Sequence, residues 1–539
     1  MRTFPPSGPV RLPAPRRASA RPADEPPGGR DLRITPYVVL GGLFWVVVSA
    51  AAWRVPMCCD FGTHAAVVER LRADLLHPAH PMADLPGAGS PYYSPYSLVQ
   101  GLFARLTDLP GRVVVRLWGP LNLLVLITGL GRFTRLFSRR PWAPVFALAF
   151  SVVLWGTDVT WWSGFLGLLS MTGNLSYPST FAIGLTFHIW AMTGRMVGLG
   201  CAADRMTERS SRAPAGSVRA AGPARPLEHA ALGVLTGVVV LVHPITSIGA
   251  VLGMAGLAVA RRGAWHRAAA ARWALTGAAA LAVAASWPYC DIFTLVGDTG
   301  IDSMHRALYE NPTGRYWLVA LLGAPALLLR LRRDRRDPLT PMTALFLLVV
   351  LYGWISGHYT YGRLLALAPI PAQVALAVEL TRPRPWSTAR RVLAPLAAAG
   401  ACLGFFWAQA GALAPGLGVR GVERPPRWDT YGWAAQHIPP GDTVLADDYY
   451  VVRSLPGYGP FLVAPVWPDP ALAEPERLRR KADVTTYLAP STSRDTRAWI
   501  ARRYGVHWLL LTAGERLPKE AVVVAFNPRS GEVLGRVAY

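Results

Sequence analysis

A carboxylate and an imidazole lie four residues apart, directly after the apolar run 34–55. They are Asp60 and His64, in the stretch CCDFGTHAAVVERL. Residues four apart share one face of a helix, so these two side chains are predicted to point the same way. A carboxylate in a partly dehydrated pocket can act as a general base. The alternative is an ordinary acidic residue at a membrane interface.

Other polar side chains stand at the predicted ends of apolar runs. Arg363, in GHYTYGRLL, begins such a run, where an unpaired guanidinium would be costly. It either binds an anion or extends to the interface. His243, in the turn HPITS between two apolar runs, either lines a cavity or caps the turn. The remaining candidates for anion or substrate contact are His64, His358, Tyr361, Tyr93, Asp291 and Asp158.

The acidic residues raise the question of a metal ion. Asp158 and Asp291 each follow an apolar run closely and have tryptophan nearby, so either could assist Asp60 or bind a divalent cation with it. Carboxylate oxygens suit Mg²⁺ or Mn²⁺. No spacing among these acids is diagnostic, so no cofactor is assigned and metal dependence is left open. Asp298 and Asp302, in GDTGIDSMHR, are further acidic residues, and His305 and Arg306 are further candidates for substrate contact. Trp161 or Trp162 either lines a substrate groove or belongs to a tryptophan belt at the membrane interface.

The elements that must position these residues are membrane spans. Of 539 residues, 52% are hydrophobic and 16% are charged. Several apolar runs are long enough to cross a hydrocarbon core about 30 Å thick, and no soluble core could bury them all. The sequence therefore predicts a mainly α, polytopic membrane protein with about eleven spans. They are placed at 34–55, 113–134, 142–160, 177–198, 229–244, 246–261, 271–287, 315–332, 340–357, 362–380 and 391–413.

The formal net charge of +23 does not indicate a nucleic-acid-binding protein. The arginines concentrate in short stretches between the apolar runs, which is typical of cytoplasmic loops. Five cysteines without metal-ligand spacing predict no disulfide framework. The first apolar run is too long for a cleavable signal peptide.

Charge distribution also predicts the orientation. Residues 1–33, rich in Pro and Arg, are expected to form a disordered, basic cytoplasmic tail. The transmembrane module 34–414 then has its first outer loop at 56–112, which places Asp60 outside. An odd number of spans puts residues 415–539 outside as well. Their predicted helices and strands, including a terminal hairpin formed by AVVVAFNP and GEVLGRVAY, indicate a small α/β or α+β domain.

The order of motifs resembles the polytopic GT-C glycosyltransferases, such as the protein mannosyltransferase and aminoarabinose transferase type. Those proteins have an acidic residue opening the first outer loop, a helix, a Pro- and aromatic-rich motif, and Arg-Leu near the head of the second span. The corresponding features are Asp60, the predicted helix 64–76, SPYYSPY (90–96) and Arg116-Leu117. Cys59 replaces one member of the usual acidic pair, and Ser-Pro-Tyr stands where many relatives have His-Pro-Pro. The tail also looks like those of actinobacterial membrane glycosyltransferases.

The resemblance implies a sugar donor carried on polyprenyl phosphate, with a glycan, lipid or protein of the cell envelope as acceptor. It implies that Asp60 is the catalytic base and that the other candidates bind the donor phosphate or a substrate. The location implied is the bacterial cytoplasmic membrane, with transfer at its outer face. Arabinofuranose and mannose are the first sugars to consider. A transporter or lipid-linked-sugar flippase is the alternative, and a non-catalytic envelope scaffold is a third hypothesis.

Overall fold

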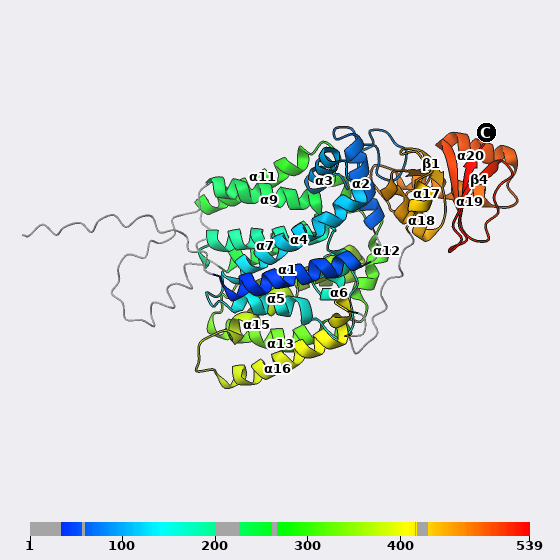
Figure 1. Ribbon diagram of the computed structural model, residues 1–539. Coiled ribbons are helices and arrows are strands. Elements are labelled where there is room, and N and C mark those ends of the chain that lie inside the picture. Colours follow the sequence, from blue (N-terminus) through cyan, green and yellow to red (C-terminus); the bar gives the residue numbers. More distant parts are fainter. Residues whose placement is uncertain are drawn as a thin grey trace, which may run out of the picture. The chain divides into compact units, whose positions relative to one another are not determined.

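The computed structural model describes residues 34–55, 60–199, 226–260, 267–414, 417 and 430–538 (Figure 1). The described residues from Pro36 onward form one compact unit. The basic tail predicted for residues 1–33 lies outside the described residues. The predicted fold class is confirmed: the chain is mainly helical and carries a small sheet near its C-terminus.

Each predicted apolar run coincides with helical structure (Figure 1). Within the described residues, seven helical segments are long and apolar enough to cross a membrane, and Ala143–Val153, Pro226–Val242 and Pro244–Val259 are shorter apolar helices. The seven are Pro36–Arg54 (α1), Gly111–Thr134 (α4), Arg267–Ala285 (α11), Pro312–Arg333 (α13), Leu339–Ser356 (α14), Tyr359–Leu380 and Thr388–Ala412.

Two predicted spans differ from the observed helices. The run 142–160 is helical only over α5 (Ala143–Val153), because the backbone then turns aside and the Asp158 amide donates to the Gly314 carbonyl of α13 at 3.0 Å. The run 362–380 is divided into a 3₁₀ segment, η4 (Tyr359–Ala366), and α15 (Ile370–Leu380). Proline at the start of α15 is compatible with a new helix but not with continuation of the old one.

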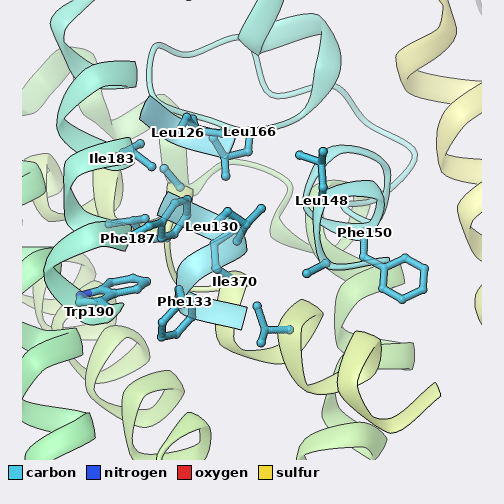
Figure 2. Close-up of a cluster of buried hydrophobic side chains, with 14 of the residues drawn as sticks. Leu126, Leu130, Phe133, Leu148, Phe150, Leu166, Ile183, Phe187, Trp190 and Ile370 are labelled. Carbon is cyan, nitrogen blue, oxygen red and sulfur yellow. The ribbon is translucent and has the colours of Figure 1, made fainter. Parts of the chain in front are cut away.

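The core of the helical part lies where α4 crosses α7 (Pro178–Met196) (Figure 2). The ring of Phe133 on α4 is 5.2 Å from that of Trp190 on α7, and both side chains are fully buried. Gly129 allows this close crossing, because a Cβ there would be 2.6 Å from the Gly184 carbonyl oxygen. The Trp190 indole donates to the Ala250 carbonyl of α10 (Pro244–Val259) at 3.1 Å.

A buried carboxylate ties three segments together at the end of α15 opposite η4. Glu379 is fully buried and accepts two hydrogen bonds from Arg333 of α13, at 3.0 and 2.9 Å. It also accepts one at 2.9 Å from Arg390 of α16 (Thr388–Gly404). Arg330 and Arg382 lie 3.9 Å from the same carboxylate. The cluster fixes α13, α15 and α16 relative to one another.

Two helices lie between α1 and α4, in the segment predicted to be the first outer loop. The predicted helix 64–76 is α2 (Phe61–Ala73), which begins directly after Asp60. The proline- and tyrosine-rich motif leads into α3 (Pro95–Thr107), where Ser94 and Ser97 form a capping box. Both helices pack against the first turns of α4, and Figure 1 shows α2 and α3 beside it.

The C-terminal part contains a five-stranded mixed sheet with the order β2-β1-β3-β5-β4. Strand β1 pairs in parallel with β2 and β3, whereas β5 pairs antiparallel with β3 and β4. The strands are Thr443–Leu445 (β1), Phe461–Leu462 (β2), Val506–Leu511 (β3), Ala521–Phe526 (β4) and Val533–Val537 (β5). The predicted terminal hairpin is therefore confirmed, but only the first residues of DTVLADDYYVV are extended.

The two faces of this sheet bury different partners. Leu445 and Leu509 face α19 (Glu474–Leu488) and α20 (Arg494–Tyr504). Their neighbours Val444 and Trp508 face the other side and pack with Val451 and with Met82 of the first outer loop. The alternation follows from the period of two along a strand. Met82 of the predicted first outer loop thus belongs to the core of the C-terminal part.

Candidate active site

Asp60 occupies the N-cap position of α2, but its side chain makes no capping hydrogen bond. A carboxylate at this position usually accepts from an amide of the first helical turn. Here the partly buried carboxylate lies in the field of two arginines from distant parts of the chain, Arg453 and Arg363. Burial raises the pKa of Asp60 above its usual range, and the two positive charges oppose that rise. The group combines the raised basicity and the stabilised charge that a general base requires.

Arg453 belongs to α18 (Tyr449–Ser454) in the C-terminal part and lies within electrostatic range of this carboxylate. The backbone carbonyl of Arg453 lies directly against Gly62, where a Cβ would overlap it. Glycine is therefore required at this crossing of α2 and α18. The Arg453 guanidinium carbon is 4.2 Å from the ring centroids of both Tyr449 and Trp467. These cation–π contacts fix the side chain beside Asp60.

Trp467 is the second contribution of the C-terminal part. Its indole nitrogen is buried without a hydrogen-bond partner at ordinary distance, and it lies close enough to Asp60 to favour the charged carboxylate. The neighbouring Asp469 is buried and fastened to the first outer loop. It accepts a hydrogen bond from Ser90 at 2.6 Å and lies 3.3 Å from His80.

Arg363 approaches Asp60 from the transmembrane module, on η4. It donates to the Ser163 hydroxyl at 2.7 Å, and its guanidinium carbon is 5.7 Å from the Trp162 ring centroid. One hydroxyl satisfies only part of a guanidinium, which carries five N–H donors. An anion beside Asp60 would therefore find a guanidinium with donors to offer.

Three histidines surround Arg363 and Asp60. The ring of His64 lies 5.9 Å from Tyr92 and 5.0 Å from Tyr177, and burial lowers its pKa to about 4. Burial and the Arg363 charge lower the pKa of His305 to about 3. Both rings are neutral at pH 7, so they can donate or accept a hydrogen bond but supply no positive charge.

His243 is the third histidine. It is the N-cap residue of α10, and its ring hydrogen-bonds the Thr246 hydroxyl at 2.8 Å. It lies within electrostatic range of Arg363, His305 and His64. The two sequence interpretations of this residue, a turn cap and a cavity residue, are therefore both compatible with its position.

The two tyrosines of the SPYYSPY motif face different surroundings. Tyr92 lies near Asp60, whose charge together with burial raises the pKa of this phenol, so it remains a neutral hydroxyl. Tyr93, the predicted candidate, is buried, donates to the Ala79 carbonyl and packs 6.0 Å from the ring of Tyr289. The structure thus brings Tyr92 rather than Tyr93 beside Asp60.

The other predicted residues take part in local contacts. His358 lies 3.3 Å from Asp302, and the ring of Tyr361 is 6.5 Å from that of His358. Asp302 also accepts a hydrogen bond from Thr360, which in turn hydrogen-bonds His305 at 3.0 Å. This chain of contacts therefore ends at His305, which lies within electrostatic range of Arg363.

Asp158 contacts the start of α13, whereas Asp291 is the N-cap residue of the 3₁₀ segment Ile292–Leu295. Asp158 accepts a hydrogen bond from the Asn311 side chain at the start of α13. Asp291 is exposed and accepts from the Phe293 amide at 3.0 Å, on a groove of about 430 Å³ that Trp287 and Tyr289 also line. Among the described residues, no three side chains of His, Cys, Asp or Glu come together in a group that could hold a metal ion.

Sequence reasoning missed Arg453 and Trp467. Both lie in a predicted soluble tail, in contexts that look like ordinary surface chemistry. The tail contains many arginines, and nothing in its local pattern distinguishes the one that reaches Asp60. Gly62, two residues after Asp60, was the one local signal of a close backbone approach.

No family model matches the chain, and no curated protein matches it in sequence. Solved structures do. The chain is similar to the cryo-EM structure of the arabinofuranosyltransferase AftD from Mycobacteria, with 15% identity, a TM-score of 0.53 and 93% of this chain covered. The R1389S mutant of AftD gives 16% identity and a TM-score of 0.54.

A second similarity is to the Archaeoglobus fulgidus oligosaccharyltransferase tethered to an acceptor peptide, with 11% identity and a TM-score of 0.50. It covers 88% of this chain and 69% of the archaeal one. The chain spans 40% of the length of AftD. Both neighbours are glycosyltransferases with the architecture that the sequence motifs predicted. The protein has a GT-C-like fold.

Proposed function

We propose that the protein is a membrane glycosyltransferase that transfers a sugar from a polyprenyl-phosphate donor to an acceptor of the cell envelope. The observation that carries this proposal is that one partly buried carboxylate, Asp60, lies within electrostatic range of the Arg363 guanidinium from a distant segment. Such a transfer needs two groups: a carboxylate that accepts a proton and a cation that binds the leaving phosphate.

In the proposed reaction, Asp60 receives the proton and Arg363 faces the charge of the leaving group. An acceptor hydroxyl oxygen attacks the anomeric carbon and forms the new glycosidic bond, while the bond from that carbon to the lipid phosphate breaks. The hydroxyl proton passes to the Asp60 carboxylate, and the bonding electrons leave with the phosphate. Arg363 stabilises the negative charge that develops on the phosphate oxygens. Neutral His64, His243 and Tyr92 would orient the hydroxyls of donor or acceptor.

The structural neighbours support glycosyl transfer as the kind of reaction. One neighbour is named an arabinofuranosyltransferase, and the other is an oligosaccharyltransferase crystallised with a tethered acceptor peptide. Because the identities are low and AftD is much longer than this chain, donor sugar and acceptor are parts of the proposal. The acceptor is an envelope glycan, lipid or protein, and arabinofuranose and mannose are the first donor sugars to test.

The proposed location is the bacterial cytoplasmic membrane, with the site at its outer face. Arginine-rich connections between the apolar runs support an N-terminus inside, and Asp60 follows the first span. Reporter fusions placed after Ala88 and after Ala464 should both be active outside the cell. Either fusion reporting a cytoplasmic position would contradict the orientation.

A transporter or flippase for the same lipid-linked sugar is the alternative. Transporters place their ionisable sites near the middle of the membrane. The candidate residues here gather at helix ends: Asp60 after α1, His243 between two apolar helices, and Arg363 at the start of a span. A site at one face of the membrane suits sugar transfer better than passage of a lipid-linked sugar across the membrane.

The experiment uses the full chain purified into lipid nanodiscs, with radiolabelled polyprenyl-phosphate arabinofuranose or mannose as donor. Candidate acceptors are an envelope glycan, a lipid acceptor and a peptide. We expect label to move to one acceptor class and to require Asp60. In a parallel assay with the protein in sealed lipid vesicles, movement of the donor across the membrane without transfer would favour the flippase. Failure of all donor and acceptor pairs would overturn the proposal.

A further inference from the structure

The segment that carries Arg453 is fixed along the whole length of α2. Near the end of α2, Arg70 donates to the carbonyl oxygens of Gly459 and Pro460, at 2.5 and 2.8 Å. Its guanidinium carbon lies 3.6 Å from the ring centroid of Phe461. At the start of α2, Gly62 packs directly against the Arg453 carbonyl. Two attachments, one at each end, therefore fix the position of Arg453 relative to Asp60.

A third attachment fixes the segment that carries Trp467. Buried Asp469 is held by Ser90 and His80 of the first outer loop, as described above. In addition, the Leu462 amide of β2 donates to the Met82 carbonyl at 2.7 Å, which extends the edge of the sheet onto that loop. Arg453 and Trp467 are thus held on both sides by contacts that do not involve Asp60 itself.

We propose that Arg453 is a positioning residue which keeps the Asp60 carboxylate anionic and oriented, so that the base is competent only when the C-terminal part is docked on α2. This inference rests on the proposed function, because it assigns Asp60 the role of base. The C-terminal part is then a component of the catalytic site, and the transmembrane module alone is insufficient.

Several charged or titratable groups lie on the elements around Asp60. Arg363 approaches from η4, Tyr92 from the segment before α3, and His64 from α2 itself. On α4, Arg116 lies 5.8 Å from the ring of the neighbouring Phe61. His64 is neutral at pH 7, and the Tyr92 phenol is neutral too. Arg453 is the stronger of the two arginine influences on Asp60.

The role assigned to Arg453 differs from that of Arg363. The Arg453 guanidinium contacts two aromatic rings, which limit its movement toward an entering ligand. Arg363 is held by one hydroxyl and a more distant ring. We therefore assign phosphate stabilisation to Arg363 and control of the Asp60 charge to Arg453.

The test measures transfer rate against pH for the wild type, Arg453→Gln and Arg453→Lys. Because the base acts unprotonated, the rate rises with pH through the Asp60 pKa. Removing the cation raises that pKa, so the acidic limb of Arg453→Gln should move to higher pH by about one to three units. Because Arg453→Lys keeps the positive charge, it should return the acidic limb most of the way to its wild-type position. The matched control is Arg112→Gln, an arginine that stacks on Tyr458 of the same segment at 4.9 Å.

A second readout does not depend on the donor. Infrared difference spectra between each protein and its Asp60→Asn counterpart report the protonated carboxyl of Asp60 as a function of pH. The same upward shift is expected in Arg453→Gln. An unchanged titration in a folded Arg453→Gln protein would overturn the inference, even if transfer were slow. Absence of transfer in the wild type would instead overturn the proposed function, while the infrared titration would still decide the role of Arg453.

Discussion

The carbonyl oxygen of Arg453 lies directly against the Cα of Gly62, the second residue of α2. This contact joins a helix of the first outer loop to a helix of the C-terminal part, two residues from the candidate base. The Ser454 Cα also lies within 2.8 Å of where a Gly62 Cβ would stand. Backbone atoms cannot rotate away as a flexible side chain could, so the crossing depends on glycine.

Gly62→Ala should therefore separate α18 from α2. We expect faster proteolysis of the C-terminal part, a lower Tm and a loss of transfer at least as large as that of Arg453→Gln. The control is Gly41→Ala in α1, where a Cβ would meet nothing within 4 Å. A Gly62→Ala protein with wild-type protease resistance and activity would show that the contact is not required.

Asp60→Asn should lower the transfer rate about 10²–10⁴-fold, the usual contribution of general-base catalysis, without loss of folding. The control is Asp108→Asn, in the same loop, whose side chain is 90% exposed and pairs with Arg72. Exposed ion pairs contribute little, and asparagine tolerates the left-handed backbone found there. Equal rates for the two variants would exclude Asp60 as the base.

Arg363→Gln should weaken use of the donor more than folding. Hydrogen bonds to charged groups contribute about 1.5–3 kcal/mol, so kcat/KM for the donor should fall about 10- to 150-fold. Arg332→Gln, at an exposed arginine of α13, serves as the control. If Arg363→Gln changed Tm strongly but left kcat/KM for the donor intact, its role would be structural.

Metal removal tests the cofactor question that the sequence left open. Two arginines beside the single carboxylate of Asp60 repel a divalent cation, so we expect transfer to continue in excess EDTA. Loss of transfer in EDTA, restored by Mn²⁺ or Mg²⁺, would mean that substrate oxygens complete a metal site with Asp60.

The Glu379 cluster should be essential for stability rather than for chemistry. Glu379→Gln leaves Arg333 and Arg390 without their charged partner in a buried position, where breaking such a pair costs about 3–5 kcal/mol. We expect a markedly lower Tm in detergent. Glu310→Gln, at an exposed residue, should have no measurable effect. A wild-type Tm for Glu379→Gln would contradict the assignment.

Sequence patterns predicted the parts of the fold that depend on local chemistry. Apolar runs located the helices, and alternating residues located the hairpin of β4 and β5, because burial leaves a periodic record along the chain. The order of Asp60, an outer-loop helix and Arg116-Leu117 indicated the GT-C-like fold. The end of α5 and the division between η4 and α15 were wrong in the prediction, because tertiary contacts and proline overrode hydropathy there.

The candidate site could be predicted only in part, for a related reason. Asp60, His64, His243 and Arg363 stand out because polar groups beside apolar runs are unusual. Arg453 does not, because an arginine in a polar tail is common. Its position relative to Asp60 depends on a backbone crossing between distant segments, and Gly62 is the only local sign of that crossing in the sequence. Tyr92 and Tyr93 could not be distinguished either, because the sequence of an irregular loop does not determine the direction in which neighbouring side chains point.

The hydrogen bonds of Arg70 join positions 389 and 390 residues apart in the sequence. During synthesis, the first outer loop is therefore complete long before the segment that docks on it emerges from the ribosome. A nascent chain that ends before residue 453 contains Asp60 and Arg363 but not Arg453, so catalysis should begin only after the segment that carries Arg453 has been synthesised. Chains that terminate before residue 453 should therefore insert into the membrane but remain inactive.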